Sequence, residues 1–377
     1  MKTIEQAKGN VRGLQSLLAE SQFDAVIAVS PENVRYIGDV YISTQSSIRD
    51  RLAFIVWPTG ASPVFIVCAV EESYVREGSW IEDIRTYREF HVSPIELLAE
   101  VLCELGLERS QVGLELQYLS AQSFDELTSR LPNLKRGSCD ELFARARLVK
   151  TADEIETLSR GFRATEQAML DTFRAIRAGH TEREMSATLA DAILRGGADE
   201  VAFNHINAGA NTGFPHKTAS TYRVGNGDVV KADSGGLYQE YHSNVGRTGK
   251  LGKPTRMEAD CWARLLNIHR QLVQLVRPGN CGRLIFEEAV KLHKRAGIDF
   301  PFGHNGHGIG LQVHEPPFIS RHDERQFQPG MVTAIETRTR WEGKLGLHMN
   351  DLVEVTAAEP IVHTGVFPVD EILSLQA

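Results

Sequence analysis

Histidine and carboxylate side chains collect in four segments of the second half of the chain, each beside an apolar run. The segments are 211–220, 231–236, 303–317 and 332–351, and they carry His216, Asp233, His304, His307, His314 and Glu336. Glu336 follows the run "MVTAI", where a carboxylate is poorly solvated unless it has a partner. The glycines of "GHGIG" let a backbone approach a ligand closely. Any one of these residues could be an ordinary hydrogen-bonded side chain, but together they predict a site that moves protons or binds metal.

The elements around these segments indicate two domains. In the first part, short Val- and Ile-rich runs alternate with helical patterns, as in α/β layers. The apolar runs are 23–30, 52–58, 63–70 and 111–118, and a helical pattern covers 93–106. Thr151 with Glu154 forms a capping box that opens a long amphipathic helix. We therefore expect an N-terminal α/β domain over 1–147 and a second domain over 148–377.

The second domain contains a weak internal repeat. Residues 173–199 and 273–299 align at an offset of 100, with matches that include Arg177/Arg277, Gly179/Gly279, Arg195/Arg295 and Gly197/Gly297. Each copy has the pattern of a helix, a glycine turn, a second helix, a glycine and a strand. The shared pattern predicts a pseudo-twofold α+β domain.

Composition narrows the class of protein. The 377 residues carry a net charge of −8 without a basic patch, which argues against nucleic-acid binding. The first 20 residues have an amphipathic helical pattern without the apolar core of a signal peptide, and no apolar run is long enough to span a bilayer. Five scattered cysteines without a CxxC pair fit a reducing compartment. We expect a cytoplasmic protein with a small-molecule substrate and neither a nucleic-acid nor a membrane partner.

Four motifs resemble those of the pita-bread hydrolases, which include methionine aminopeptidase, aminopeptidase P, prolidase and creatinase. "RLVKTADEIETL" resembles the entry to that catalytic domain, and "HNGHGIGLQVHEPP" is close to its H-x-x-G-H-G-I-G-L-x-x-H-E-x-P signature. "YHSNVGRT" resembles Y-x-S-D-x-x-R-T, and "IETRTRWEGKLGLHMND" resembles I-E-P-G-x-Y…G-x-R-x-E-D. The resemblance implies a creatinase-type N-terminal domain, a pita-bread catalytic domain and a homodimer.

In the metallopeptidase members of this family, the resemblance implies five ligands that hold two metal ions. Asp233, His307 and Glu336 match three of them, whereas Asn244 and Asn350 stand where the two bridging carboxylates would be. Two divalent ions need anionic bridges to offset their mutual repulsion. We therefore expect no dinuclear site, and either no metal or one weakly bound divalent ion on the three retained ligands. Restoring both carboxylates, as Asn244→Asp with Asn350→Glu, is expected to restore metal binding.

The family also contains creatinase-like members that cleave C–N bonds without metal. By resemblance, His216 and His314 match its catalytic and substrate-bonding histidines. We expect His216 to act as general base or proton shuttle, Asp233 or Glu336 to orient it or the water, and His307 and His314 to hydrogen-bond the developing oxyanion. The residues leave open which histidine does which work.

Departures from the family motifs bear on the substrate. Arg338 and Arg340 follow Glu336 where the family motif E-P-G has small, uncharged residues. Strand alternation places both arginines on the same face as Glu336. Either they form ion pairs on a solvated face or they bind a substrate carboxylate, Arg338 foremost. His348 stands where the family usually has arginine, and we expect it to contact substrate together with His304, Asn244 and Asn350.

Three functions remain open from these residues. The first is a creatinase-like hydrolase of a C–N bond in a small, carboxylate-bearing compound, without a normal dinuclear site. The second is an Xaa-Pro dipeptidase or aminopeptidase with an atypical, at most mononuclear, metal site. The third is a non-catalytic relative that binds a peptide, which the many titratable residues of the cleft disfavour.

Overall fold

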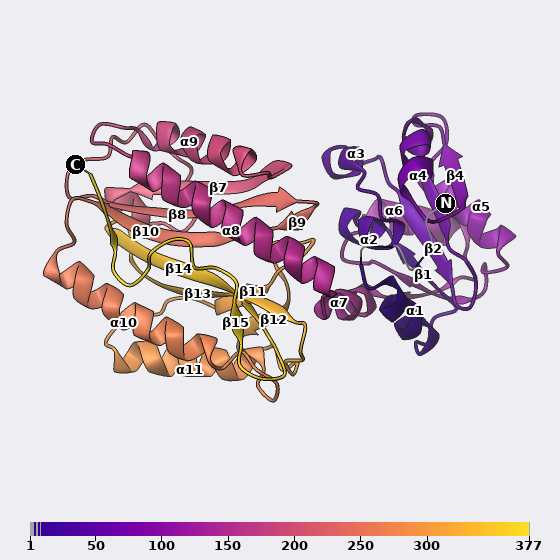
Figure 1. Cartoon of the computed structure of the whole chain (residues 1–377). Coiled ribbons are helices and arrows are strands. Elements are labelled where there is room, and N and C mark those ends of the chain that lie inside the picture. Colours follow the sequence, from indigo (N-terminus) through magenta and orange to yellow (C-terminus); the bar gives the residue numbers. More distant parts are fainter. Residues whose placement is uncertain (1–3, 5–6, 8, 377) are drawn as a thin grey trace. The chain divides into compact units, whose positions relative to one another are not determined.

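The computed structural model describes residues 4, 7 and 9–376, and the chain divides into two compact units. The first unit ends at Arg147 and the second begins at Leu148 (Figure 1). Of the amphipathic helix expected over the first 20 residues, the part from Val11 to Ala19 is helical, and residues 1–3, 5, 6 and 8 lie outside the described residues. No helix in the described part of the chain is long and apolar enough to cross a membrane.

The first unit is one six-stranded sheet with helices around it, in the strand order β4-β3-β2-β1-β5-β6. Its strands are β1 (Ala25–Ala28), β2 (Phe54–Pro58), β3 (Val64–Cys68), β4 (Asp83–Tyr87), β5 (Gln111–Leu114) and β6 (Lys135–Ser138). Its helices are α1 (Val11–Ala19), α2 (Pro31–Gly38), α3 (Ser43–Ser47), η2 (Ala69–Glu71), α4 (Glu72–Gly78), α5 (Pro94–Glu104), α6 (Ala121–Arg130) and α7 (Asp140–Leu148).

The predicted strands of the first unit are confirmed. The apolar patterns did not predict its two edge strands, and the reason is physical. The apolar runs form β1, β2, β3 and β5, whose residues are almost all buried. The edge strands β4 and β6 read "DIRTY" and "KRGS", and each has two exposed residues. An edge strand faces solvent along one side, so it needs no continuous apolar pattern.

The described part of the second unit contains two five-stranded sheets and two pairs of helices. The sheets have the orders β16-β10-β8-β7, with β9 paired to β8, and β12-β11-β13-β14-β15. The strands are β7 (Glu200–Ala208), β8 (Val229–Tyr238), β9 (Tyr241–His242), β10 (Val245–Leu251), β11 (His304–Gly308), β12 (Glu315–Ser320), β13 (Val332–Trp341), β14 (Leu345–Glu354), β15 (Ile361–Val362) and β16 (Leu373–Leu375). The helices are α8 (Ala152–Ala175), η3 (Gly209–Gly213), α9 (Glu182–Arg195), α10 (Arg256–Val273) and α11 (Gly282–Arg295).

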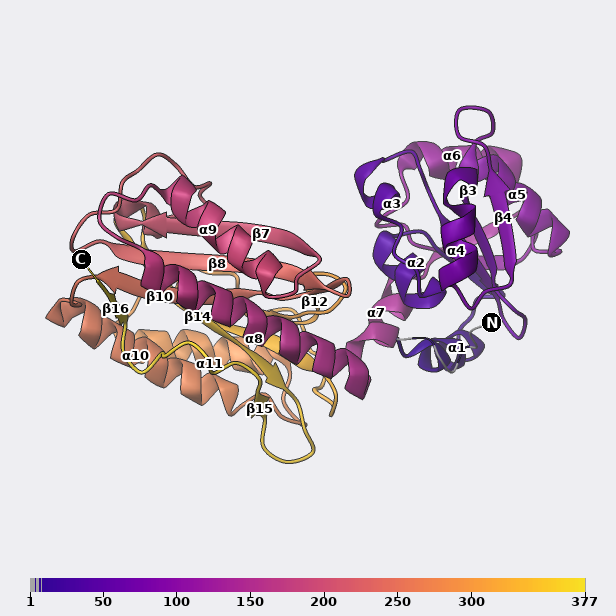
Figure 2. The same ribbon diagram turned by 45° about the horizontal axis from the view of Figure 1, so that its top comes forward.

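The predicted repeat is confirmed in the helix pairs. The bounds of α9 and α11 differ by the offset of 100, and the turns before them contain Gly179 and Gly279 with φ of 91° and 89°. Helices α8 and α9 contact the strands β8 and β7, whereas α10 and α11 contact β13 and β12. Figures 1 and 2 show the two helix pairs on opposite sides of the strands of this unit. The capping box of Thr151 and Glu154 opens α8 as predicted.

The two sheets of the second unit meet along β10 and β14, where their side chains and backbones bond. Thr248 on β10 donates its hydroxyl hydrogen to the carbonyl oxygen of His348 on β14 at 2.9 Å, and the His348 backbone N–H donates to the Thr248 hydroxyl oxygen at 2.9 Å. This contact places the polar residues of β8, β11, β13 and β14 within one cavity.

Candidate active site

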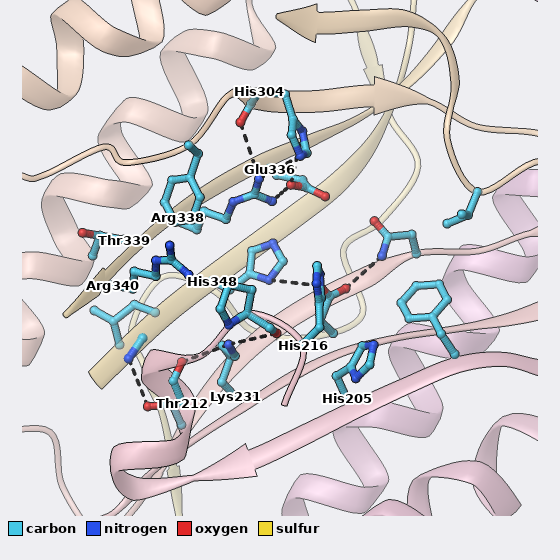
Figure 3. Close-up of a pocket in the computed structure, with 18 of the residues that line it drawn as sticks. His205, Thr212, His216, Lys231, His304, Glu336, Arg338, Thr339, Arg340 and His348 are labelled. Carbon is cyan, nitrogen blue, oxygen red and sulfur yellow. Dashed lines mark hydrogen bonds and ion pairs between the residues drawn. The ribbon is translucent and has the colours of Figure 1, made fainter. Parts of the chain in front are cut away.

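The second unit contains a cavity of about 680 Å³ between its two sheets. Strands β7 and β8 and the turn after η3 line one wall, and β11, β13 and β14 line the other (Figure 3). Nine of the predicted site residues line this cavity: His216, Asp233, Asn244, His304, His314, Glu336, Arg338, Arg340 and His348. His307 and Asn350 lie just behind the wall, buried against residues that line it.

The two asparagines form a directed chain of hydrogen bonds that ends on Asp233. The backbone N–H of Gly246 donates to Asn350 Oδ1, and Asn350 Nδ2 donates to Asn244 Oδ1 at 2.8 Å. Asn244 Nδ2 then donates to Asp233 Oδ1 at 2.9 Å. Asn244 therefore turns an N–H, and not a lone pair, toward the carboxylate. Burial alone would raise the pKa of Asp233, but the neighbouring His348 ring and the charges of Arg338 and Lys231 outweigh it and hold that pKa below its usual value.

Glu336 lies between a histidine and an arginine. Its Oε1 lies 3.4 Å from His307 Nε2, and its Oε2 forms an ion pair with Arg338 Nη1. His307 Nδ1 lies 3.0 Å from the carbonyl oxygen of Gly308, a bond that places the proton on Nδ1 and leaves Nε2 as a lone pair facing the carboxylate. Figure 3 shows Arg338 and Glu336 directed at each other inside the cavity.

The two arginines of β13 have different surroundings. Arg338 Nη2 also lies 3.1 Å from His304 Nε2, and its guanidinium carbon lies 4.5 Å from the centre of the Phe302 ring. Arg340 packs against the same ring at 5.4 Å. Among the residues that the structure describes, Arg340 has no carboxylate partner, so its guanidinium is available to an anion.

Three histidines of the cavity, His304, His307 and His314, have lowered pKa values and are neutral at physiological pH. Burial, assisted by the positive charge of Arg338, lowers the pKa of His304 to about 3. Burial likewise lowers the pKa of His307 and of His314 to about 4. The rings of His307 and His314 lie 3.9 Å apart between their centres. Neutral imidazoles can accept and donate a proton, which suits them to hydrogen bonding at a reacting centre.

His216 lies on the turn after η3 and is exposed at the cavity wall. Lys231 on β8 holds this turn, because its Nζ donates to the carbonyl oxygens of Thr212 at 2.9 Å and Phe214 at 2.8 Å. Burial lowers the pKa of Lys231 to about 8. The rings of His216 and His205 lie 5.2 Å apart between centres, so His205 on β7 borders the same space.

His348 fills the space that its neighbour Gly246 leaves open. A Cβ on Gly246 would lie 2.6 Å from the His348 ring, so any larger residue at 246 would displace the imidazole. His348 Nδ1 lies 3.8 Å from Asp233 Oδ2, and burial lowers the pKa of His348 to about 3.

Lys231, His205 and Phe302 are site residues that the sequence analysis did not identify. Lys231 lies in the same strand as Asp233 and two residues before it, so strand alternation could have placed it on the same face. His205 had no such signal. It lies opposite Asp233 through the pairing of β7 with β8, and these two strands are far apart in the sequence. Phe302 lies two residues before His304, in a segment without regular structure.

The comparisons with known proteins match both units. The model of metallopeptidase family M24 matches residues 156–357, and the model of the creatinase/prolidase N-terminal domain matches residues 11–149.

Individual relatives match more than half of the chain, and two of the three described here match nearly all of it. An Xaa-Pro dipeptidase of Pyrococcus furiosus is 27% identical over 353 residues, which are 93% of this chain and 95% of that protein. A probable dipeptidase PepE of Mycobacterium bovis is 33% identical over 218 residues, 57% of this chain and 58% of that protein. The crystal structure of an X-Pro aminopeptidase from Thermotoga maritima has a TM-score of 0.85 at 25% identity and covers 97% of this chain and 99% of its own.

Proposed function

The chain belongs to metallopeptidase family M24, joined to a creatinase/prolidase N-terminal domain, and on that premise we propose that it hydrolyses a C–N bond in a small, dipeptide-sized substrate that bears a carboxylate. Hydrolysis of C–N bonds is the chemistry of this family. The substrate class is the part that this proposal adds.

The charge of the cavity supports an acidic substrate. Lys231, Arg338 and Arg340 are cationic and line the cavity with two carboxylates, Asp233 and Glu336. Because His304, His307, His314 and His348 are neutral, the cations are in excess by one. Arg340, which has no carboxylate partner among the described residues, is the group that carries the proposal. A guanidinium on an aromatic ring at a cavity wall binds a carboxylate well.

The ion pair of Arg338 with Glu336 changes which arginine we expect to hold the acid. The sequence favoured Arg338 as the residue that binds the carboxylate, with Arg340 farther out. Arg338 already has a carboxylate partner. We therefore assign the substrate carboxylate to Arg340 and leave Arg338 beside the reacting centre.

The relatives favour the peptidase function over the creatinase-like one. Their names are Xaa-Pro dipeptidase, probable dipeptidase and X-Pro aminopeptidase. A dipeptide has both features that the cavity calls for, a hydrolysable C–N bond and a free carboxylate. The peptidase function and the creatinase-like function therefore share one substrate class. A dipeptide with proline in second position is the first compound to test.

The metal implied by the family does not fit the residues of this cavity. Among the described residues, no group of three or more His, Cys, Asp or Glu side chains is arranged to hold a metal ion. Asn244 and Asn350 bond to each other and to Asp233, and the guanidinium of Arg338 pairs with Glu336. The steps proposed below therefore use the side chains alone.

In the proposed reaction, His216 accepts a proton from the attacking water and returns it to the leaving nitrogen. Its exposed position on the turn held by Lys231 suits a group that exchanges protons with solvent. We assign the stabilisation of the negative charge that develops on the carbonyl oxygen to His314 with Arg338 and not to His307, because His307 donates its one N–H to the carbonyl oxygen of Gly308. Acid–base catalysis of this kind contributes about 10²–10⁴-fold to the rate.

A paired substrate panel tests this function. Release of amine would be measured for Xaa-Pro dipeptides, for their C-terminal amides, and for ureido and amidino acids with their neutral counterparts. The acids are expected to react faster than the matching neutral compounds, and His216→Ala is expected to lower turnover by about 10²–10⁴-fold while folding is unchanged. Equal turnover of acids and amides would refute the carboxylate requirement. Full activity of His216→Ala would move the proton transfer to His314.

A further inference from the structure

Arg338 stands directly in front of a residue that the family motif makes a metal ligand. It lies two positions after Glu336 on β13, where the motif E-P-G has a glycine, and it projects from the same face. Its side chain is held in three ways: the ion pair with Glu336, the contact of Nη2 with His304 Nε2 at 3.1 Å, and the packing on Phe302. A side chain with so many contacts has a fixed position.

A fixed guanidinium at this place opposes a metal ion in two ways. It occupies Oε2 of Glu336, so that the carboxylate loses one of its two donor atoms. It also repels a divalent cation a few ångströms away, and that repulsion is strong where water is excluded. Arg338 is mostly buried, since its side chain is 16% exposed.

We infer that Arg338 provides a built-in positive charge in place of a metal ion, and that this charge, in addition to the loss of two carboxylates, keeps divalent metals out of the cavity. The sequence had suggested that restoring the two carboxylates is sufficient to restore metal binding. With Glu336 already paired, it is not sufficient.

The charge of Arg338 reaches every other retained ligand position. It helps to keep the pKa of Asp233 below its usual value, and it contributes to the low pKa of His307. It lowers the pKa of His304, His314 and His348 in the same way.

Arg340 offers a matched control within the same strand. It has the same chemical type, lies on the same face two residues later and packs on the same ring, but it has no carboxylate partner among the described residues. Its removal takes away one positive charge from the cavity and leaves Glu336 paired. Any effect that is specific to Arg338 must therefore come from its place and not from net charge.

The experiment counts metal ions on four proteins that are dialysed against Mn²⁺ or Co²⁺. They are the natural chain, the double variant Asn244→Asp with Asn350→Glu, that double variant with Arg338→Gly, and that double variant with Arg340→Gly. Elemental analysis gives the stoichiometry, and the visible absorption of Co²⁺ reports ligation. Circular dichroism and thermal unfolding verify the fold of each protein, and Arg338→Met replaces Arg338→Gly if the glycine variant does not fold.

Only the variant without Arg338 is expected to bind about two metal ions, with an affinity on the order of a hundredfold above that of the double variant. The double variant and its Arg340→Gly control are expected to bind less than one ion each. Two ions on the double variant would overturn the inference, since Arg338 would then be no obstacle. No gain in the Arg338 variant would overturn it as well. The count of metal ions needs no substrate, so this result is independent of the proposed hydrolysis.

Discussion

Arg247 on β10 and Arg338 on β13 both face carboxylates inside the second unit, but they are bonded to very different degrees. Arg247 is 1% exposed and donates to Glu166 Oε1 at 2.6 Å, to Asp351 Oδ1 at 2.8 Å and to the carbonyl oxygens of Gly246 and Asn350. Among the described residues, Arg338 pairs with one carboxylate and also contacts a histidine and an aromatic ring. One arginine ties strands together, and the other leaves bonding capacity at a cavity wall.

The surroundings of the two residues shift their pKa values in opposite directions. Burial alone would lower the pKa of Arg247, but the charges of Asp351 and Glu166 outweigh it and raise that pKa. Burial lowers the pKa of Arg338 to about 10, because Asp233 offsets only part of it. A buried cation with full compensation supports the fold, whereas one with partial compensation marks a binding site.

The largest effect is expected from Arg247→Ala. The change leaves Glu166 and Asp351 without their shared partner, so the unfolding free energy of the second unit should fall by about 3–5 kcal/mol. Denaturant unfolding followed by the fluorescence of Trp262 and Trp341 measures it. Arg195→Ala, which breaks an exposed pair with Asp191, serves as the control and should cost less than about 1 kcal/mol. Equal losses of stability in Arg247→Ala and Arg195→Ala would show that the buried ion pairs of Arg247 stabilise the fold no more than an exposed pair does.

Arg340→Ala is expected to act on substrate and not on the fold. The loss of its guanidinium should weaken transition-state binding of an acidic substrate by about 2 kcal/mol or more, with little effect on the matching amide. The ratio of kcat/KM for acid and amide, measured in the natural chain and the variant, gives this difference. An unchanged ratio would assign the carboxylate to another residue of the cavity.

A smaller loss of stability is expected from Arg338→Met. This change keeps much of the volume packed on Phe302 and leaves one carboxylate, Glu336, at the wall of a cavity that water can enter. The unfolding free energy should fall by about 1–2 kcal/mol, less than half of the effect at Arg247. Parallel denaturant curves for the two variants test the ranking. A loss as large as that of Arg247→Ala would make Arg338 a structural residue.

The last effect concerns a third buried cation, Lys231, whose hydrogen bonds among the described residues go to carbonyl oxygens. Its pKa is lowered from 10.5 to about 8 in the folded chain, so the unfolded chain binds more protons between these values. Stability should therefore rise with pH from about 8 toward 10.5 through this residue. Lys231→Met should flatten that rise when unfolding is measured across the range. An identical slope in both proteins would show that Lys231 keeps its ordinary pKa.

The sequence predicted much of the frame, because the frame depends on local patterns. Apolar runs predicted the central strands β1, β2, β3 and β5, and Thr151 with Glu154 predicted the start of α8. Glu336, Arg338 and Arg340 occupy alternate positions of one strand, which predicted that they share a face. These inferences need only neighbours in the sequence.

The missing parts depend on contacts between distant segments. Lys231 reaches the turn of His216 through the carbonyl oxygens of Thr212 and Phe214, a contact that no local pattern signals. The pairing of Arg338 with Glu336 instead of a ligand depends on the position of Phe302, which precedes β11, and of His304, which begins it. Spacing gives the residues of a site, and packing decides which of them are already bonded.

The hydrogen-bonded amides of Asn244 and Asn350 also bear on the chemical ageing of the protein. Asparagine loses its amide nitrogen when the next backbone nitrogen attacks the side chain, and the product is a carboxylate. At both positions the following residue belongs to a paired strand, Val245 opposite Ser234 and Asp351 opposite Ile335. Strand pairing and the bonded amides hold these groups away from that attack. The folded chain therefore preserves the charge of its cavity over time, and unfolding would expose two positions where deamidation introduces negative charge.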